Sequence, residues 1–231
     1  MNNLLSYNTR KKGYYRDREI EWDIDRFQVL TVEQIYLLHF KNIKNKKQAL
    51  IKTRERLRKL VKLKKIKREK INYYGKPYGF YIHKPKGYTL EHIINRNWGY
   101  LYAMFYNPNF KLNDFENEYV VGDLQADGFI QLYSPKGKKY SYWFIESDRS
   151  SSKNKFDKII KYNEMFKNDK YIDEFWVVDK RPDNFPKILI VTDTMEKFNK
   201  IQKHIQKENK MGLEFILLTV DKIRQFLLGS N

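Results

Sequence analysis

The feature that most constrains the fold is a strongly basic segment, residues 41–70, which also carries the apolar pattern of a helix. It holds 15 basic and two acidic residues, so 15 − 2 = 13 of the chain's 18 net positive charges fall within 30 residues. The positions that recur at three- and four-residue steps, the spacing of one helical face, are Ala49, Leu50, Thr53, Leu57, Leu60 and Val61. This pattern predicts a helix with a buried side and a cationic side.

The cationic side of this helix is the candidate binding surface. Projected at about 100° per residue, the positions opposite the apolar ones are Gln48, Lys52, Glu55, Lys59 and Lys62, with Arg56 and Arg58 at the flanks. A net charge of +18 favours a polyanionic partner, either nucleic acid or an anionic membrane. A run of charges can also be only a solvated helix face. The elements before and after this helix therefore determine whether the cationic side is interpreted as a binding surface.

Two shorter helices are predicted before the basic helix. Asp23–Val29 has a short helical pattern. Thr31 is a typical N-cap residue and Gln34 follows it by three positions, so the two predict a capping box that opens a helix over Ile35–Phe40. The basic helix is then the third of three.

A hairpin is predicted after the basic helix, because residues 66–73 and 78–82 form strand-like runs around a turn at 74–77. Three helices followed by a hairpin are the order of a winged helix-turn-helix, whose third helix enters the major groove while the wing contacts the DNA backbone or the minor groove. We therefore expect double-stranded DNA as the partner, with RNA as the alternative. We expect base contacts by Gln48 and Lys52, phosphate contacts by Arg58, Lys59, Arg68 and Lys70, and further DNA contacts by Arg56 and Lys62.

The length of 231 residues allows one large domain or two smaller ones. We expect a winged helix-turn-helix domain with a basic N-terminal tail over residues 1–86, a connector helix capped by Thr89 within residues 87–109, and an α/β domain over residues 110–231. In the last domain, strands are expected at 119–121, 129–133, 140–146, 175–178, 188–192 and 213–220, and helices near 153–168, 194–209 and 221–228. The expected fold class is α+β overall, with a mixed sheet in this α/β domain.

Several classes of chemistry are excluded by residue types and motifs that the sequence lacks. Without cysteine there is no disulfide scaffold, thiolate metal site or cysteine nucleophile. The phosphate-binding glycine loop of motors and helicases does not occur, and the four histidines are scattered without metal-ligand spacing. The sequence has neither an 18-residue apolar stretch nor a signal-peptide core before Arg10, so we expect a cytoplasmic protein without a membrane partner.

The most informative pair of predicted strands flanks a tight turn. With Lys136 and Gly137 as its central residues, the numbers of opposed residues sum to 273, and Asp127 lies opposite Glu146. Because side chains alternate along a strand, Asp127, Glu146 and Asp148 point to the same face. Opposed carboxylates destabilise a strand pair unless a cation lies between them.

A divalent metal ion would supply that cation. Oxygen ligation by Asp127, Glu146 and Asp148 suits Mg²⁺ or Mn²⁺. Such an ion can activate water and stabilise the charge that develops on a phosphodiester. The alternative is that these acids are solvated strand ends, with a local ion pair within residues 146–149.

Short motifs in this region resemble a known family. Gln125–Gly128 (QADG), the hairpin, and Phe144–Arg149 (FIESDR), followed by a helix with Lys158 and Tyr162, resemble the replication-relaxation proteins of Gram-positive plasmids and mobile elements. The resemblance covers roughly residues 25–225. It implies a winged helix-turn-helix followed by a domain similar to the restriction-endonuclease fold with its PD-(D/E)xK motif.

The resemblance also implies roles for individual residues. Asp127 and Glu146 match the two acids of the motif, whereas Asp148 stands where an active nuclease has the lysine that orients or activates the attacking water. A lysine from the next helix could replace it. Lys158 is the candidate, because Tyr162 follows four residues later on the same helical face and both side chains could point at the acids. The candidate catalytic residues are therefore Asp127, Glu146 and Lys158.

These observations predict a double-stranded DNA-binding protein of a plasmid or other mobile element, acting in replication, relaxation or transfer, with a nuclease-like domain that is either active or degenerate. Replication or relaxosome proteins are the expected protein partners. Two alternatives stay open: a transcriptional regulator without catalysis, and an active Mg²⁺-dependent DNA nickase or endonuclease. A homodimer also stays open, because winged-helix proteins often pair on palindromes but no long heptad stretch marks a dimer seam.

Overall fold

The computed structural model describes residues 2–73, 76–150, 156–177 and 185–229. It divides into two compact units, Met1–Ile94 and Asn95–Asn231, and the division falls inside a helix, α4 (Leu90–Tyr106). Both units combine helices with strands, and the large sheet of the second unit contains parallel and antiparallel pairs. The chain therefore has the mixed α and β composition that its sequence predicts.

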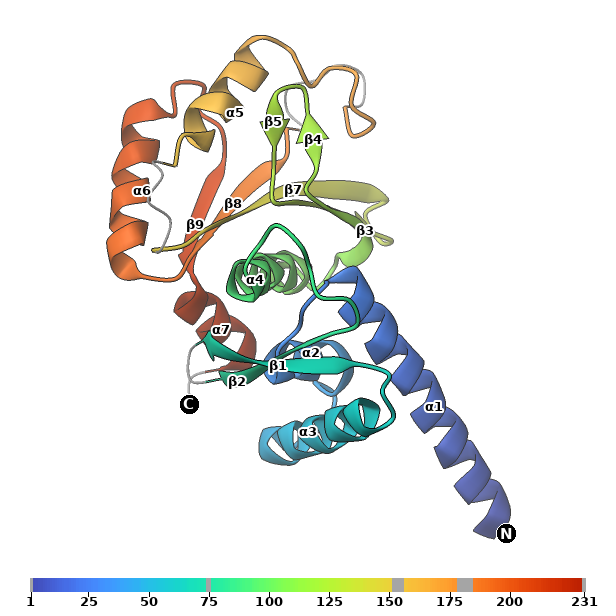
Figure 1. Cartoon of the computed structure of the whole chain (residues 1–231). Coiled ribbons are helices and arrows are strands. Elements are labelled where there is room, and N and C mark those ends of the chain that lie inside the picture. The colour runs from blue at the N-terminus through green and yellow to red at the C-terminus, as the bar shows by residue number, and fades with distance from the viewer. Residues whose placement is uncertain (1, 74–75, 151–155, 178–184, 230–231) are drawn as a thin grey trace. The chain divides into compact units, whose positions relative to one another are not determined.

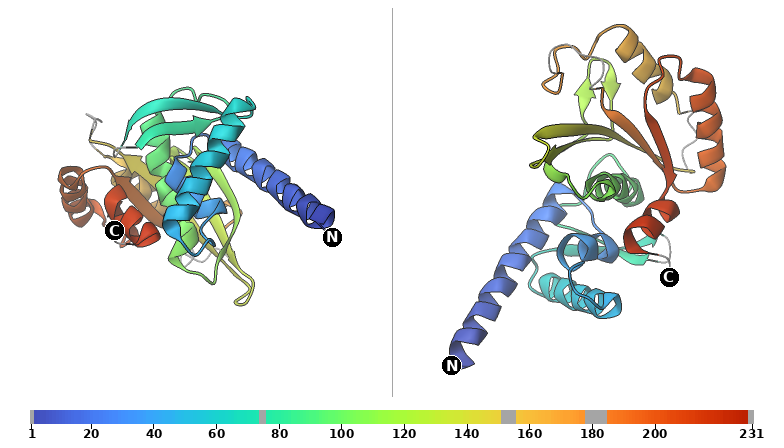
Figure 2. Two further views of the ribbon diagram at one scale, coloured as in Figure 1. Left: turned by 90° about the horizontal axis from the view of Figure 1, so that it is seen from below. Right: turned by 180° about the vertical axis from the view of Figure 1, so that it is seen from behind.

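The complete elements of the first unit are three helices and a two-stranded hairpin (Figures 1 and 2). Its elements are α1 (Asn2–Arg26), α2 (Val32–His39), α3 (Lys46–Lys62), β1 (Lys67–Tyr73) and β2 (Lys76–Tyr81). The two strands pair antiparallel, as predicted, and residues 74 and 75 of the predicted turn lie outside the described residues. Leu30, between α1 and α2, adds an antiparallel bridge to Phe80 through two backbone hydrogen bonds of 3.0 and 2.9 Å.

Local signals in the sequence explain where α2 and α3 begin. The hydroxyl of Thr31 accepts from the backbone N–H of Gln34, and the side-chain oxygen of Gln34 accepts from the backbone N–H of Thr31 at 2.9 Å, so the predicted capping box is confirmed. Asn45 caps α3 through its side chain. The predicted apolar side of α3 is also confirmed, because its buried residues are Ala49, Thr53, Leu57 and Leu60.

The beginning of the chain differs from the prediction. The pattern predicts a short helix over residues 23–29 after a basic tail, but α1 is one helix of 25 residues that ends at Arg26. Among its described side chains, the first fully buried ones are Ile20 and Ile24, whereas Tyr14 and Tyr15 are exposed. A helix that is polar over most of its length shows no apolar periodicity, so the pattern reveals only its buried end.

The second unit is built on a five-stranded sheet in the order β3-β6-β7-β8-β9. The strands are β3 (Lys111–Asn117), β6 (Gly128–Ser134), β7 (Lys139–Asp148), β8 (Lys187–Thr192) and β9 (Phe215–Thr219). β3, β6 and β7 pair antiparallel, whereas β7, β8 and β9 pair parallel, so the predicted mixed sheet is confirmed. A small hairpin of β4 (Val120–Val121) and β5 (Leu124–Gln125) precedes β6.

Two helices, α5 (Lys158–Lys167) and α6 (Met195–Glu208), cover one face of this sheet (Figure 1). They contribute Tyr162 and Ile201 to a buried cluster that also contains Phe144 of β7. Because side chains alternate along a strand, every second residue of β7 from Phe144 onward lies on this face. The sheet thereby turns the acidic end of β7 toward α5 and α6.

The opposite face of the sheet is covered by the part of α4 that belongs to the second unit. This helix packs so closely that a Cβ atom at Gly99 would lie 2.6 Å from Cγ2 of Ile145 and 3.1 Å from Val191. Glycine is therefore required at this crossing. The last helix, α7 (Val220–Leu228), follows β9 directly, and its Phe226 contacts Tyr102 of α4.

Some predictions for the second unit are wrong. The aromatic run predicts a strand over residues 175–178, but 175–177 form a turn in which Trp176 is fully buried and Phe175 is 62% exposed, and Val178 lies outside the described residues. The edge strand β3 has no counterpart in the prediction, because its sequence KLNDFEN is polar and no side chain in it is fully buried. The helix predicted near 153–168 spans Lys158–Lys167, and residues 151–155 lie outside the described part. None of the helices in the described segments is both long enough and apolar enough to cross a membrane.

Candidate functional site

The hairpin of β6 and β7 brings the predicted acids to one end of the sheet. Gly128 pairs with Ile145, so the numbers of opposed residues sum to 273 and the predicted register is confirmed. Asp127 directly precedes β6, and its carboxylate accepts a hydrogen bond of 2.7 Å from the backbone N–H of Ser147 on β7. This bond fixes Asp127 beside the part of β7 that carries Glu146.

Four side chains meet at this end of the sheet, and we call them the acid–lysine cluster: Asp127, Glu146, Lys158 and Tyr162. Nζ of Lys158, in the first turn of α5, lies 3.1 Å from Oδ1 of Asp127 and also donates to Oε2 of Glu146. The hydroxyl of Tyr162, one turn later, donates to Oε1 of Glu146 at 2.8 Å. The four-residue spacing on α5 thus places both side chains against the acids.

Burial sets the electrostatics of the acid–lysine cluster. Glu146 is fully buried, and burial raises the pKa of its carboxyl from 4.5 to about 7 against the opposing charge of Lys158. Burial also disfavours the charged form of Lys158, but the charges of Glu146 and Asp127 outweigh it and raise the pKa of the ammonium group. Burial and the Glu146 charge raise the pKa of Tyr162 well above its usual value. At neutral pH the lysine is therefore charged and the tyrosine neutral.

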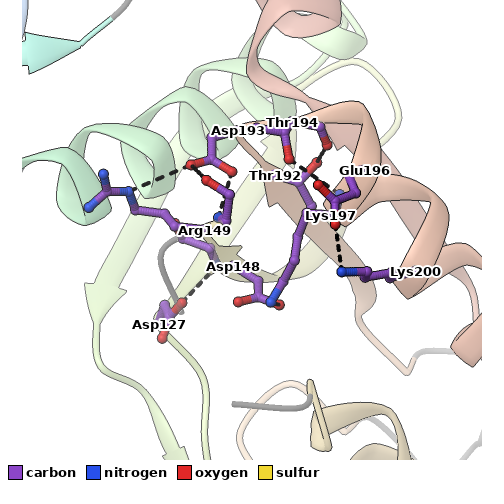
Figure 3. A network of polar contacts seen from close by, with 11 residues as sticks. Asp127, Asp148, Arg149, Thr192, Asp193, Thr194, Glu196, Lys197 and Lys200 are labelled. Atoms are coloured by element: carbon purple, nitrogen blue, oxygen red, sulfur yellow. Dashed lines mark hydrogen bonds and ion pairs between the residues drawn. The ribbon is translucent and has the colours of Figure 1, made fainter. Parts of the chain in front are cut away.

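Asp148, the third predicted ligand, is held by a different partner (Figure 3). Its Oδ2 lies 3.0 Å from Nζ of Lys197, in the first turn of α6, and both side chains are largely buried. Burial raises the pKa of Asp148, and the Lys197 charge opposes this shift. Asp193, which follows β8, accepts hydrogen bonds from both the backbone N–H and the hydroxyl of Ser150, at 2.7 and 2.9 Å. The charged partner of Asp148 is therefore Lys197.

Asp127 and Glu146 have the ligand type that a hard divalent ion takes, although both carboxylates pair with Lys158 in this structure. Mg²⁺ is commonly bound by one or two carboxylates together with substrate phosphates, and Asp127 and Glu146 supply two carboxylates. Within the described segments, no group of three or more acidic, histidine or cysteine side chains is placed to hold a metal ion. The structure thus brings together two of the three predicted ligands, and Asp148 stays with Lys197.

The residues predicted to contact DNA lie on α3 and β1 of the first unit. We call their exposed side chains the basic face: Gln48, Lys52, Arg58, Lys59, Lys62, Arg68 and Lys70. Arg56 is placed differently, because its guanidinium group donates to the carboxylate of Asp17 and, at 2.7 Å, to the carbonyl of Gly13, both on α1. Arg56 therefore connects α3 to α1 and is not part of the basic face.

Lys197 is a charged residue near the acids that the sequence did not reveal. It reaches Asp148 because β7 and β8 are parallel neighbours, paired at Asp148 and Thr192, so the segment after β8 begins beside the end of β7. The carboxyl ends of parallel strands meet at the same edge of a sheet, where binding sites of such sheets are commonly found. Knowledge of this pairing would have singled out Lys197, because it follows β8 by only five positions.

Comparisons of this chain with protein-family models, with curated proteins and with solved structures gave no match. The geometry of the basic face and of the acid–lysine cluster therefore carries the functional argument.

Proposed function

We propose that the first unit is a winged helix-turn-helix and that the chain binds double-stranded DNA through it. The observation that carries this proposal is the basic face. α3 buries its apolar side and exposes Lys52, Lys59 and Lys62, while β1 adds Arg68 and Lys70. A recognition helix and a wing that are both cationic match the two places where this motif contacts DNA.

The connections of the first unit support the same proposal. The segment before α2 is joined to the hairpin, because Leu30 forms an antiparallel bridge with Phe80 of β2. The capping box at Thr31 fixes the start of α2, and Gln34 also donates to the carbonyl of Ile94 at 3.0 Å. These contacts hold α2 in place, so that α3 can present its exposed side.

The salt dependence of DNA binding tests this proposal. The affinity for duplex DNA falls as salt is added, and the slope of log affinity against log salt concentration is negative. Every lysine–phosphate pair that a substitution removes reduces the magnitude of this slope by about 0.9. The double variant Lys52→Ala/Lys59→Ala should therefore bind a duplex more weakly and with a slope smaller by about 1 to 2. The matched control is Lys203→Ala/Lys207→Ala, which removes two exposed lysines of α6. If the slope of the first variant equals that of the wild type, α3 is not the DNA-binding helix.

The acid–lysine cluster favours a second function, metal-dependent cleavage of a phosphodiester in DNA. The specific observation is that Lys158 reaches both Asp127 and Glu146 from a neighbouring helix. In the proposed PD-(D/E)xK-like domain, this lysine takes the role that the motif assigns to position 148, where this chain has Asp148. With Lys158 in this role, the proposed centre has the two acids and the lysine of a nuclease, although position 148 of the motif is an aspartate.

Each residue of the acid–lysine cluster has a defined part in such a reaction. Asp127 and Glu146 would hold Mg²⁺ or Mn²⁺, which supplies a more acidic water and stabilises charge on the phosphate. Lys158 is charged at neutral pH, so it attracts the phosphate and stabilises negative charge on its oxygens. Tyr162 orients Glu146 through its hydrogen bond and is a positioning residue.

Cleavage of supercoiled plasmid with Mg²⁺ or Mn²⁺, and with chelator, tests this second function. The wild type should nick or linearise the plasmid only with metal, and Asp127→Asn should abolish this activity. Asp123→Asn, which changes an aspartate that is 88% exposed, is the matched control and should cleave normally. Absence of cleavage, together with a mobility shift retained in chelator, would favour a DNA-binding protein with a degenerate nuclease-like domain or a transcriptional regulator.

The combination of these two units supports membership in the replication-relaxation family. We accordingly propose a role in replication, relaxation or transfer of a plasmid or other mobile element, with replication or relaxosome proteins as partners. If the protein is instead a regulator, Asp127→Asn and Glu146→Gln should leave DNA affinity unchanged or slightly higher and remove no activity. A loss of cleavage in these variants would contradict the regulatory alternative.

A further inference from the structure

The first unit contains a hollow of about 260 Å³ that borders the basic face and shares Arg58 and Arg68 with it. It is bordered by α2, α3 and the β1–β2 hairpin, and its lining residues are Val32, Glu33, Arg54, Arg58, Arg68, Tyr78 and Phe80. Three arginines thus surround a small space whose other walls are mainly apolar or aromatic. This combination is unlike an ordinary solvated helix face.

The fold explains why these side chains converge. Arg54 and Arg58 are four residues apart on α3, so both lie on the side of this helix that faces the hollow. In the hairpin, Arg68 is paired with Phe80, and Tyr78 lies two residues from Phe80, so all three side chains are on the same face. Phe80 is only 5% exposed and is fixed by its backbone bonds to Leu30, so it forms a rigid wall.

The charges of the hollow favour an anion. Its side chains carry three positive charges and one negative charge, from Glu33, so their sum is 3 − 1 = +2. Guanidinium groups bind phosphate through paired hydrogen bonds. In addition, the guanidinium carbon of Arg68 lies 4.7 Å from the ring centroid of Tyr78. An arginine and a tyrosine in contact offer flat surfaces on which a nucleobase can stack.

We propose that this hollow binds a single nucleotide, with the base against Tyr78 and Phe80 and the phosphate at Arg54, Arg58 and Arg68. Pockets that enclose a drug-sized ligand measure roughly 300–1,000 Å³. The hollow, at about 260 Å³, lies just below this range and so has room for one ring system. The nucleotide can be an unpaired nucleotide within a bound DNA duplex, and in that case the inference rests on the proposed DNA binding. A free mononucleotide has the same chemistry and is the other source.

The affinity of the full-length protein for matched DNA duplexes tests the proposal. One duplex is fully paired, and the other has the same sequence with one extrahelical adenosine. The wild type should bind the second duplex about 10-fold more tightly, which corresponds to about 1.4 kcal/mol. Tyr78→Leu keeps an apolar side chain and the net charge but removes the stacking surface, so the affinity ratio should fall to about 1. Tyr14→Leu changes an exposed tyrosine of α1 and should keep the wild-type ratio.

Further measurements separate this proposal from the proposed DNA binding. Titration with deoxyadenosine monophosphate tests the hollow without any duplex. If the wild type binds neither duplex, DNA binding has failed, and Tyr78-dependent binding of the mononucleotide would still support the hollow with a free nucleotide as its ligand. Arg54→Lys, which retains the charge but loses paired hydrogen bonding, should lower the ratio several-fold and serves if Tyr78→Leu does not fold. An affinity ratio near 1 without mononucleotide binding, or a ratio unchanged in both variants, would overturn the proposal.

Discussion

Glu146→Gln should change how the stability of the second unit depends on pH. The pKa of Glu146 is about 7 in the folded protein, compared with 4.5 for an exposed glutamate, because the side chain is fully buried. The folded state therefore binds the proton more tightly than the unfolded state does. This contribution to stability is fully present below pH 4.5 and is lost as the pH rises through about 7.

The size of the effect follows from the two pKa values. Each unit of difference corresponds to about 1.36 kcal/mol, and between pH 5 and pH 8 the contribution of Glu146 falls by about 2–3 kcal/mol. Glutamine resembles the protonated acid at every pH. Relative to the wild type, Glu146→Gln should therefore gain about 2–3 kcal/mol in free energy of unfolding over this interval.

Urea unfolding followed by tryptophan fluorescence measures this difference in the unit concerned. Trp98, Trp143 and Trp176 are buried in the second unit, whereas Trp22 of the first unit is 58% exposed. Glu164→Gln, which changes an exposed glutamate of α5, is the control and should keep a constant difference from the wild type. If the difference between Glu146→Gln and the wild type is also constant from pH 5 to pH 8, the buried carboxyl does not have a raised pKa.

Three further substitutions test contacts of the fold. Thr31→Ala removes the capping hydroxyl of α2 and should lower the free energy of unfolding of the first unit by about 1 kcal/mol, measured by circular dichroism. Gly128→Ala would place a Cβ atom onto the hydroxyl of Tyr100, a buried group that donates to a backbone carbonyl at 2.7 Å, and overpacking of this kind should destabilise the second unit by about 1–3 kcal/mol in the fluorescence assay. Lys197→Met would leave Asp148 without its lysine and should destabilise the same unit by about 3–5 kcal/mol at pH 8, with a smaller loss at low pH, where the carboxyl is protonated.

The features that the sequence predicts correctly are governed by neighbours in the chain. The capping box needs only Thr31 and Gln34, and the register of β6 and β7 follows from the two residues at the centre of their turn. Lys158 meets the acids because α5 is the next helix after β7. In each case the turn or helix joining the residues restricts the arrangement enough for periodicity to identify the contacts.

The features that the sequence does not predict depend on partners that are distant in the chain. Arg56 lies on the predicted cationic side of α3, and only the position of α1 shows that Asp17 engages it. Lys197 requires the parallel pairing of β7 with β8, which the intervening 38 residues, 149–186, do not encode in a local pattern. Trp176 is buried although it lies in a turn, so its apolar character predicted a strand where tertiary packing produced none.

The position of Lys158 defines what separates an active centre from a degenerate one. Its ammonium group pairs with the two carboxylates that would hold a metal ion, so the ion and the lysine compete for the same oxygen atoms. An active centre requires Lys158 to move toward the substrate phosphate when the acids take the metal. The side chain of Lys158 is 24% exposed whereas that of Glu146 is fully buried, so the lysine has an open direction in which to move and the glutamate does not. Metal binding requires the ionised carboxyl, and the pKa of Glu146 is about 7. An active centre should therefore also lose metal affinity as the pH falls below 7. A degenerate centre should instead keep Lys158 between the acids at every pH at which they are charged.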